Sequence, residues 1–96
     1  MNNMENKQHI FRTVTLALQM KLCSIGLEIV EVEKQETRDG HHRVCLGFNI
    51  TDDKIGAFKQ VMETRRERIP DELFAELKEL RHQRLQEYFD KFSDKE

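Results

Sequence analysis

Between Leu27 and Ile50 the chain reads LEIVEVEKQETRDGHHRVCLGFNI, a pattern that predicts two antiparallel strands joined by a tight turn. The first half is rich in β-branched residues, and from Arg43 onward apolar residues alternate with polar or small ones. Asp39-Gly40 lies between the halves and is a strong turn signal. We therefore expect a β-hairpin over these residues.

The side-chain pattern also predicts the length of the hairpin loop. A two-residue loop would place glutamates of the first strand opposite apolar residues of the second. A three-residue loop over residues 38–40 instead pairs Val30 with Phe48 and Val32 with Leu46, which makes one face wholly apolar. We expect this loop, with its last residue, a glycine, in the left-handed conformation of a bulge. A five-residue loop has the same parity and stays an alternative.

Apolar residues at helical spacing precede and follow the hairpin. Residues 4–25 carry them at intervals of three and four, which predicts one long helix that ends at Gly26 in the left-handed conformation. Residues 51–53, a threonine and two aspartates, can start a second helix, which should stop before Pro70. That proline and the acids after it open a third helix, which runs to about Phe92.

These elements predict an α+β fold with the order α-β-β-α-α, in which helices pack on one face of an antiparallel β-hairpin. With 96 residues, the chain has room for one hydrophobic core, and we expect a single domain over residues 1–96. Apolar residues make up 38% of the chain and charged residues 35%, which favours a folded domain with well-solvated helix faces over a disordered segment.

Composition narrows the expected partners and compartment. The formal net charge is −2, from 16 basic and 18 acidic residues, so the chain as a whole does not attract polyanions. No apolar run approaches the roughly 20 residues that a membrane span needs, and the first residues lack the layout of a signal peptide. Cys23 and Cys45 fit a reducing compartment better than a disulfide scaffold. We expect a cytoplasmic protein that binds no membrane.

Residues able to carry chemistry do not form a recognisable catalytic or metal-binding pattern. There are four histidines and two cysteines but no CxxC or HxxxH spacing, and the adjacent His41 and His42 would diverge in a strand. Cys23 belongs to the apolar line of the first predicted helix, and Cys45 faces Glu33 across the predicted hairpin, which disfavours a thiolate. We expect no enzyme, no cofactor and no metal.

The second strand of the hairpin offers one candidate docking surface. Its outward-facing residues are small or uncharged apart from a single arginine: Arg43, Cys45, Gly47 and Asn49. The first strand instead carries glutamates, which discourage the addition of another strand. We expect the second strand to pair with its symmetry mate or with a strand of a partner protein. The alternative is that the third helix or the N-terminal segment covers this edge.

The end of the third predicted helix offers a second candidate surface. Three aromatic residues, Tyr88, Phe89 and Phe92, stand within five positions of one another. Large aromatic side chains are seldom left in water. They either pack on the first helix of the same chain or form the apolar face of a helix end that docks into a partner.

A third candidate surface is basic. Residues that could together line one end of the domain and bind phosphates or an acidic protein are Arg65, Arg66 and Arg68, with Arg38, His41, His42 and Arg43 at the hairpin tip. Glu63 and Glu67 interrupt the arginines, and no aromatic residues are interleaved to stack on bases. A solvated helix end is the simpler interpretation of this cluster.

The sequence therefore favours a small cytosolic protein–protein interaction module, such as an adaptor, an inhibitor or a regulatory subunit. Such a protein binds or occludes a macromolecular partner without covalent chemistry, and a homodimer formed through the hairpin is one expected arrangement. The alternative is a nucleic-acid-binding regulator that uses the basic surface.

Overall fold

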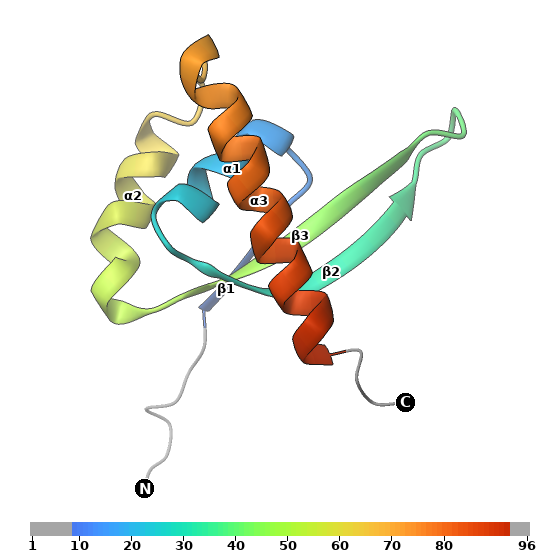
Figure 1. Cartoon of the computed structure of the whole chain (residues 1–96), viewed down its shortest axis with the longest axis horizontal. Helices are drawn as coiled ribbons and strands as arrows, with labels where there is room; N and C mark the ends of the chain where they lie inside the picture. The colour runs from blue at the N-terminus through green and yellow to red at the C-terminus, as the bar shows by residue number, and fades with distance from the viewer. Residues whose placement is uncertain (1–8, 93–96) are drawn as a thin grey trace, which may run out of the picture.

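The computed structural model describes residues 9–92 of the chain. Its elements are β1 (His9–Thr13), α1 (Leu16–Ser24), β2 (Glu28–Glu36), β3 (His42–Ile50), the short 3₁₀ helix η2 (Asp52–Lys54), α2 (Ile55–Glu63) and α3 (Asp71–Phe92). The strands form one antiparallel sheet in the order β1-β3-β2, and α3 packs against α1 and β2 (Figure 1). The expected α+β class, with helices on one face of an antiparallel hairpin, is confirmed.

The long helix expected over residues 4–25 is wrong in its first half. The chain is a strand from His9 to Thr13 and becomes helical only at Leu16; the residues before His9 lie outside the described part. A short apolar run fits both helical and strand periodicity, and here long-range pairing decides between them. Phe11 lies opposite Phe48 of β3, and its ring centroid is 5.3 Å from that of Phe58 in α2.

The expected helix end at Gly26 is confirmed. Gly26 has a φ of +88°. Its N–H donates to the carbonyl of Cys23 at 3.0 Å, and the N–H of Leu27 donates to the carbonyl of Leu22 at 3.4 Å. This pair of bonds satisfies carbonyls that the last turn of a helix otherwise leaves free. It also turns the chain directly into β2.

The three-residue loop of the hairpin is confirmed as well. The N–H of Thr37 donates to the carbonyl of His41 at 2.8 Å, which closes the loop over residues 38–40. Gly40 has a φ of +82°, the left-handed conformation that the bulged loop requires. The distal half of the hairpin is exposed and extends away from the helices as an arm (Figure 1).

One expected strand pair is wrong. Val32 lies opposite Leu46 as predicted, but Ile29, not Val30, lies opposite Phe48, because the register shifts between Ile29 and Glu31. The bulge makes Val30 an extra residue in β2. Because of this extra residue, the side chain of Ile29 is buried in the core opposite Phe48.

The second and third helices lie close to their expected positions. Residues 52–54 form the 3₁₀ turn, and α2 ends at Glu63, so the second helix stops before Pro70 as predicted. Lys21 holds the connection that follows, because its ammonium donates to the carbonyls of Thr64 (3.0 Å) and Glu67 (2.6 Å). The helix α3 begins directly after Pro70, whose carbonyl accepts from the N–H groups of the first turn at 2.9 and 3.1 Å.

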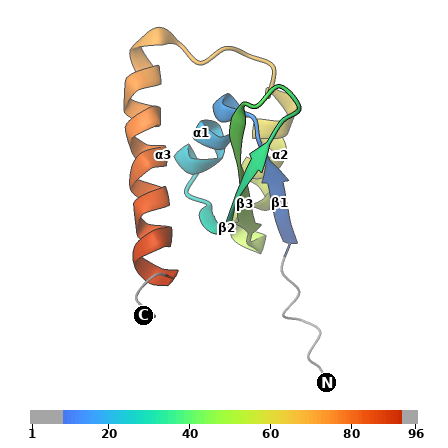
Figure 2. The ribbon, with the colours of Figure 1, turned by 90° about the vertical axis from the view of Figure 1, so that its right-hand side faces the viewer.

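The core lies between α1 and the inner face of the sheet. Its buried residues come from α1, β2, β3 and the segment between α1 and β2: Leu18, Leu22, Cys23, Leu27, Ile29, Leu46, Phe48 and Ile50. Burying a large apolar side chain of this kind stabilises a fold by about 1.5–3 kcal/mol. The helix α3 has no fully buried residue and lays only one side on α1 and β2 (Figure 2). No helix in residues 9–92 is long and apolar enough to cross a membrane.

One polar side chain is buried inside this core. Gln19 of α1 is 1% exposed. Its amide nitrogen donates to the carbonyls of Thr13 and Val44, both at 2.8 Å, and its amide oxygen accepts from Nε of Arg81 at 2.8 Å. Buried polar groups are tolerated when they are hydrogen-bonded, and here the bonds join α1 to β1, β3 and α3. They place the C-terminal end of β1 against the rest of the sheet.

Candidate functional site

The edge of the sheet that the sequence predicted to be open is occupied. The strand β3 is central, and β1 pairs with it from Leu46 to Ile50, which includes Gly47 and Asn49. Arg43 and Cys45 lie beyond the end of β1. Between them, the carbonyl of Val44 accepts a hydrogen bond from the side chain of Gln19. Addition of a partner strand along β3 is therefore excluded for most of its length. Of the alternatives, the one in which the N-terminal segment covers this edge is correct.

Gly47 has a structural role on the outer face of the sheet. It lies between Arg12 of β1 and Glu31 of β2, whose side chains meet above it in a two-bond ion pair. Nε and Nη2 of Arg12 donate to the two carboxylate oxygens of Glu31 at 2.6 and 2.9 Å. These bonds lower the pKa of Glu31. A Cβ on Gly47 would lie 3.0 Å from Cβ and Oε1 of Glu31, so a larger residue would require Glu31 or the neighbouring strand to shift.

The two edges that remain are the outer sides of β1 and β2. The outer strand β2 is guarded by the kind of charge that discourages strand pairing, with four glutamates at positions 28, 31, 33 and 36. The outer strand β1 has the sequence HIFRT, and its one formal charge, on Arg12, is paired with Glu31. Within residues 9–92 no strand pairs with the outer side of β1. This edge is the better template for a further strand.

An apolar hollow adjoins the edge of β1. It has a volume of about 450 Å³ and is lined by residues of β1, of α2 and of the end of β3: His9, Ile10, Phe11, Ile50, Ile55, Phe58 and Lys59. Figure 2 shows β1 at the outer edge of the sheet, with α2 beside it and α3 on the far side. Ile55 at the rim is 41% exposed. The hollow can accept an apolar side chain that reaches over the strand edge.

The aromatic end of α3 is divided between core and solvent. The ring of Tyr88 is half-buried against the core, and its centroid lies 5.4 Å from that of Phe89 and 4.7 Å from that of Phe92. Phe89 is 44% exposed and Phe92 is 51% exposed. This end of α3 lies beside β2, since Lys91 donates to the Glu28 carboxylate at 2.7 Å. Of the three aromatic residues, Tyr88 therefore packs within its own chain, where it contacts the buried core residues. Phe89 and Phe92 are largely exposed.

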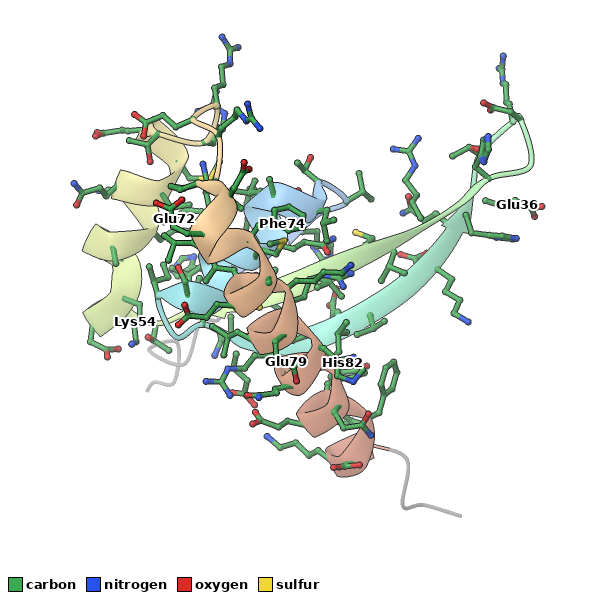
Figure 3. The ribbon with its side chains drawn as sticks, turned by 45° about the horizontal axis from the view of Figure 1, so that its top comes forward. Glu36, Lys54, Glu72, Phe74, Glu79 and His82 are labelled. Atoms are coloured by element: carbon green, nitrogen blue, oxygen red, sulfur yellow. The ribbon has the colours of Figure 1, made fainter. Side chains whose placement is uncertain are left out.

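The basic residues that could have lined one end of the domain lie in two separate places. The group Arg65, Arg66 and Arg68 lies in the connection between α2 and α3, whereas Arg38, His41, His42 and Arg43 lie at the hairpin tip. These two places are at opposite ends of the longest axis in Figure 1, and Figure 3 likewise shows Glu36 near the tip far from Glu72 at the start of α3. Each group is interrupted by acids, Glu63 and Glu67 in the first and Glu36 and Asp39 in the second.

Metal-ligating groups and cysteine thiols are the remaining candidates for chemistry within residues 9–92. No group of three or more histidine, cysteine or acidic side chains in residues 9–92 is arranged to hold a metal ion. Both cysteines are free thiols. Burial raises the pKa of Cys23 to about 11, which keeps it protonated and unreactive at neutral pH. Partial burial lowers the pKa of the neighbouring Arg81.

Sequence reasoning missed the residues that flank the open edge. It assigned His9, Ile10 and Phe11 to a helix and treated Ile55 and Phe58 only as the apolar stripe of α2. The density of β-branched and aromatic residues between Ile10 and Thr15 is the signal that could have indicated a strand. The chain matches no protein-family model, no curated protein and no solved structure.

Proposed function

We propose that this protein is a small protein–protein interaction module that binds an extended segment of a partner along the outer edge of β1. The observation that supports the proposal is a strand edge that no other part of residues 9–92 pairs with, beside an apolar hollow of about 450 Å³. In strand addition, backbone hydrogen bonds supply affinity, and pockets for alternate side chains supply specificity. The edge of β1 offers the backbone hydrogen-bonding groups, and the hollow between β1 and α2 offers a pocket for a side chain.

The contacts that hold β1 in place favour this use of its edge. Its inner side is paired with β3 over all five residues, and its end is tied to α1 through Gln19. Phe11 is packed edge-on against Phe58 of α2. A template held in this way loses little conformational entropy when a further strand binds, which increases the affinity.

The proposed action is occlusion or bridging of the partner without covalent chemistry, as in an adaptor, an inhibitor or a regulatory subunit. We place this action in the cytoplasm, because two free thiols fit a reducing compartment. Self-association is one form that the same edge can support, since a second copy also offers strand edges.

The test is a selection of binding peptides from a displayed library of random extended sequences against the full chain. The decisive variant is Ile55→Glu, which places a charge at the rim of the hollow. Its matched control is Leu73→Glu on α3, because Leu73 is 43% exposed and Ile55 is 41% exposed. We expect Ile55→Glu to weaken the selected peptides at least tenfold and Leu73→Glu to leave their affinity unchanged.

Backbone pairing is tested separately from side-chain binding. N-methylation of alternate peptide amides removes the donors that a strand needs while it keeps the side chains, so one of the two methylated sets should lose binding. Amide NMR of the labelled chain should place the shifts at His9–Thr13 and at α2. Peptides that bind elsewhere, or that tolerate both methylation patterns, would refute strand addition at β1.

A further inference from the structure

The charges around the hollow indicate what kind of segment would bind there. Among the lining residues that belong to the described part of the chain, the ionisable side chains are Lys59 of α2 and His9 of β1, and none is a carboxylate. Neither side chain makes a hydrogen bond or an ion pair with another residue in the described part of the chain. Within the described residues, the hollow is therefore mainly apolar and carries the unpaired ammonium of Lys59 on its exposed side.

Three charged side chains close in the chain to residues of the hollow, Lys54, Arg12 and Asp53, are engaged in other contacts. The Lys54 ammonium donates to the carbonyl of Ile25 at 3.1 Å, and Arg12 is paired with Glu31. The carboxylate of Asp53 accepts from the hydroxyl of Thr51 at 2.6 Å and is not among the residues that line the hollow. Within residues 9–92, Lys59 is thus a cation beside the hollow that can meet an incoming anion.

We infer that the partner segment is acidic: an extended stretch that adds to β1, places an apolar side chain in the hollow and directs a carboxylate to Lys59. This inference rests on the proposed strand addition at β1 and names the chemistry of its partner. An exposed ion pair adds little affinity, so the charge mainly selects among segments that the strand edge would otherwise accept equally.

The same charges argue against a second copy as the occupant. Pairing of β1 with the β1 of another copy would bring Lys59 of both chains to one shared edge, where like charges repel. Pairing of β1 with the glutamate-rich β2 of another copy would match the charges, but this head-to-tail contact leaves an open edge at each end and does not close. A segment of a different protein meets neither difficulty.

The experiment compares peptides selected on the wild-type chain with those selected on Lys59→Glu, and uses Lys78→Glu on exposed α3 as the matched charge control. We expect Asp and Glu to be enriched over the input library on the wild type and on Lys78→Glu. On Lys59→Glu the excess should vanish or change to Lys and Arg. In a single acidic peptide, replacing Glu by Gln should raise the Kd about two- to fivefold on the wild type and leave it unchanged on Lys59→Met.

The possible failures are distinguishable. Peptides that depend on Ile55 but show no acidic excess would overturn the charge inference and leave strand addition at β1 intact. A selection without any peptide that depends on Ile55 would overturn both. Light scattering across a dilution series tests whether a second copy binds this edge instead. A dimer that Ile55→Glu dissociates and Leu73→Glu leaves intact would identify a second copy as the occupant and overturn the inference of an acidic partner segment.

Discussion

Gly47 illustrates how one residue without a side chain supports an interaction across three strands. It is buried beneath the ion pair of Arg12 and Glu31, although it lies on the solvent side of the sheet. Its neighbours on the outer strands would contact a Cβ at 3.0 Å for Glu31 and 3.2 Å for Ile10. The sequence pattern places this glycine on an exposed docking edge, whereas in the structure it lets a side-chain pair bridge β1 and β2 over β3.

Gly47→Ala is therefore expected to destabilise the fold. Over-tight packing of this kind costs about 1–3 kcal/mol, because the neighbouring strands or the ion pair must shift. Gly56→Ala is the matched control, since a Cβ at Gly56 in α2 meets nothing within 4 Å. It should be neutral or stabilising by up to about 1 kcal/mol. Urea unfolding measures both, and equal stability of the two variants would contradict the steric role of Gly47.

The ion pair should also make stability depend on pH. Arg12 lowers the pKa of Glu31, so the contribution of the pair is present above the ordinary pKa of glutamate. It is lost as the pH falls from that value through the lowered pKa of Glu31. We expect Arg12→Met to be less stable than the wild type at neutral pH and the difference to shrink in acid. NMR titration of the Glu31 carboxyl should show a higher pKa in Arg12→Met; an unchanged pKa would show that the pair does not persist in solution.

At the scale of the elements, Gln19 joins parts of the chain that are distant in the sequence. Its amide satisfies the carbonyl at the end of β1 and one in β3, and it orients Arg81 of α3. The helix α1 is short, from Leu16 to Ser24, so its position depends on such tertiary contacts more than on helix propensity. These bonds connect the proposed binding strand to the core.

Gln19→Leu removes both amide donors and the acceptor while it keeps similar bulk. Two partly buried carbonyls then lose their partner, and so does Arg81, and we expect a loss of about 1–3 kcal/mol in the free energy of unfolding. Gln83→Leu on the exposed side of α3 is the control and should stay within about 0.5 kcal/mol of the wild type. Urea unfolding at neutral pH measures the two differences. A Gln19→Leu variant as stable as its control would mean that these bonds contribute nothing.

At the scale of the whole molecule, charge is distributed without a single basic face. The arginines of the α2–α3 connection and the basic residues of the hairpin tip lie far apart, each beside acids (Figure 1). Binding to a polyanion gains from several cations that contact neighbouring phosphates together. The separation of the two groups therefore weakens the alternative of a nucleic-acid-binding regulator.

We expect the chain not to retard duplex DNA or single-stranded RNA in a gel shift at about 150 mM salt. The double variant Arg65→Glu with Arg66→Glu should behave as the wild type does. Retardation that weakens steeply with salt and disappears in this variant would instead support the nucleic-acid alternative.

Local chemistry determined the features that the sequence predicted correctly. Gly26 ends α1 because a left-handed residue is needed there, and the alternation of apolar residues in β3 fixes an odd loop that closes at Gly40. The third helix was predictable because a proline followed by acids marks its start and because apolar residues continue at helical spacing to Phe92. Each of these depends on residues that are near one another in the chain.

Tertiary structure alone decided where the open edge lies. Residues His9–Thr13 fit a helix or a strand by spacing, and their pairing with β3, some 40 residues away, selects the strand. That pairing covers the predicted edge of β3, exposes the edge of β1 and brings α2 beside it. The bulge at Val30 and the separation of the two basic groups likewise depend on tertiary contacts between distant parts of the chain. Contacts of this range depend on the packing of the whole chain, which short-range sequence patterns do not encode.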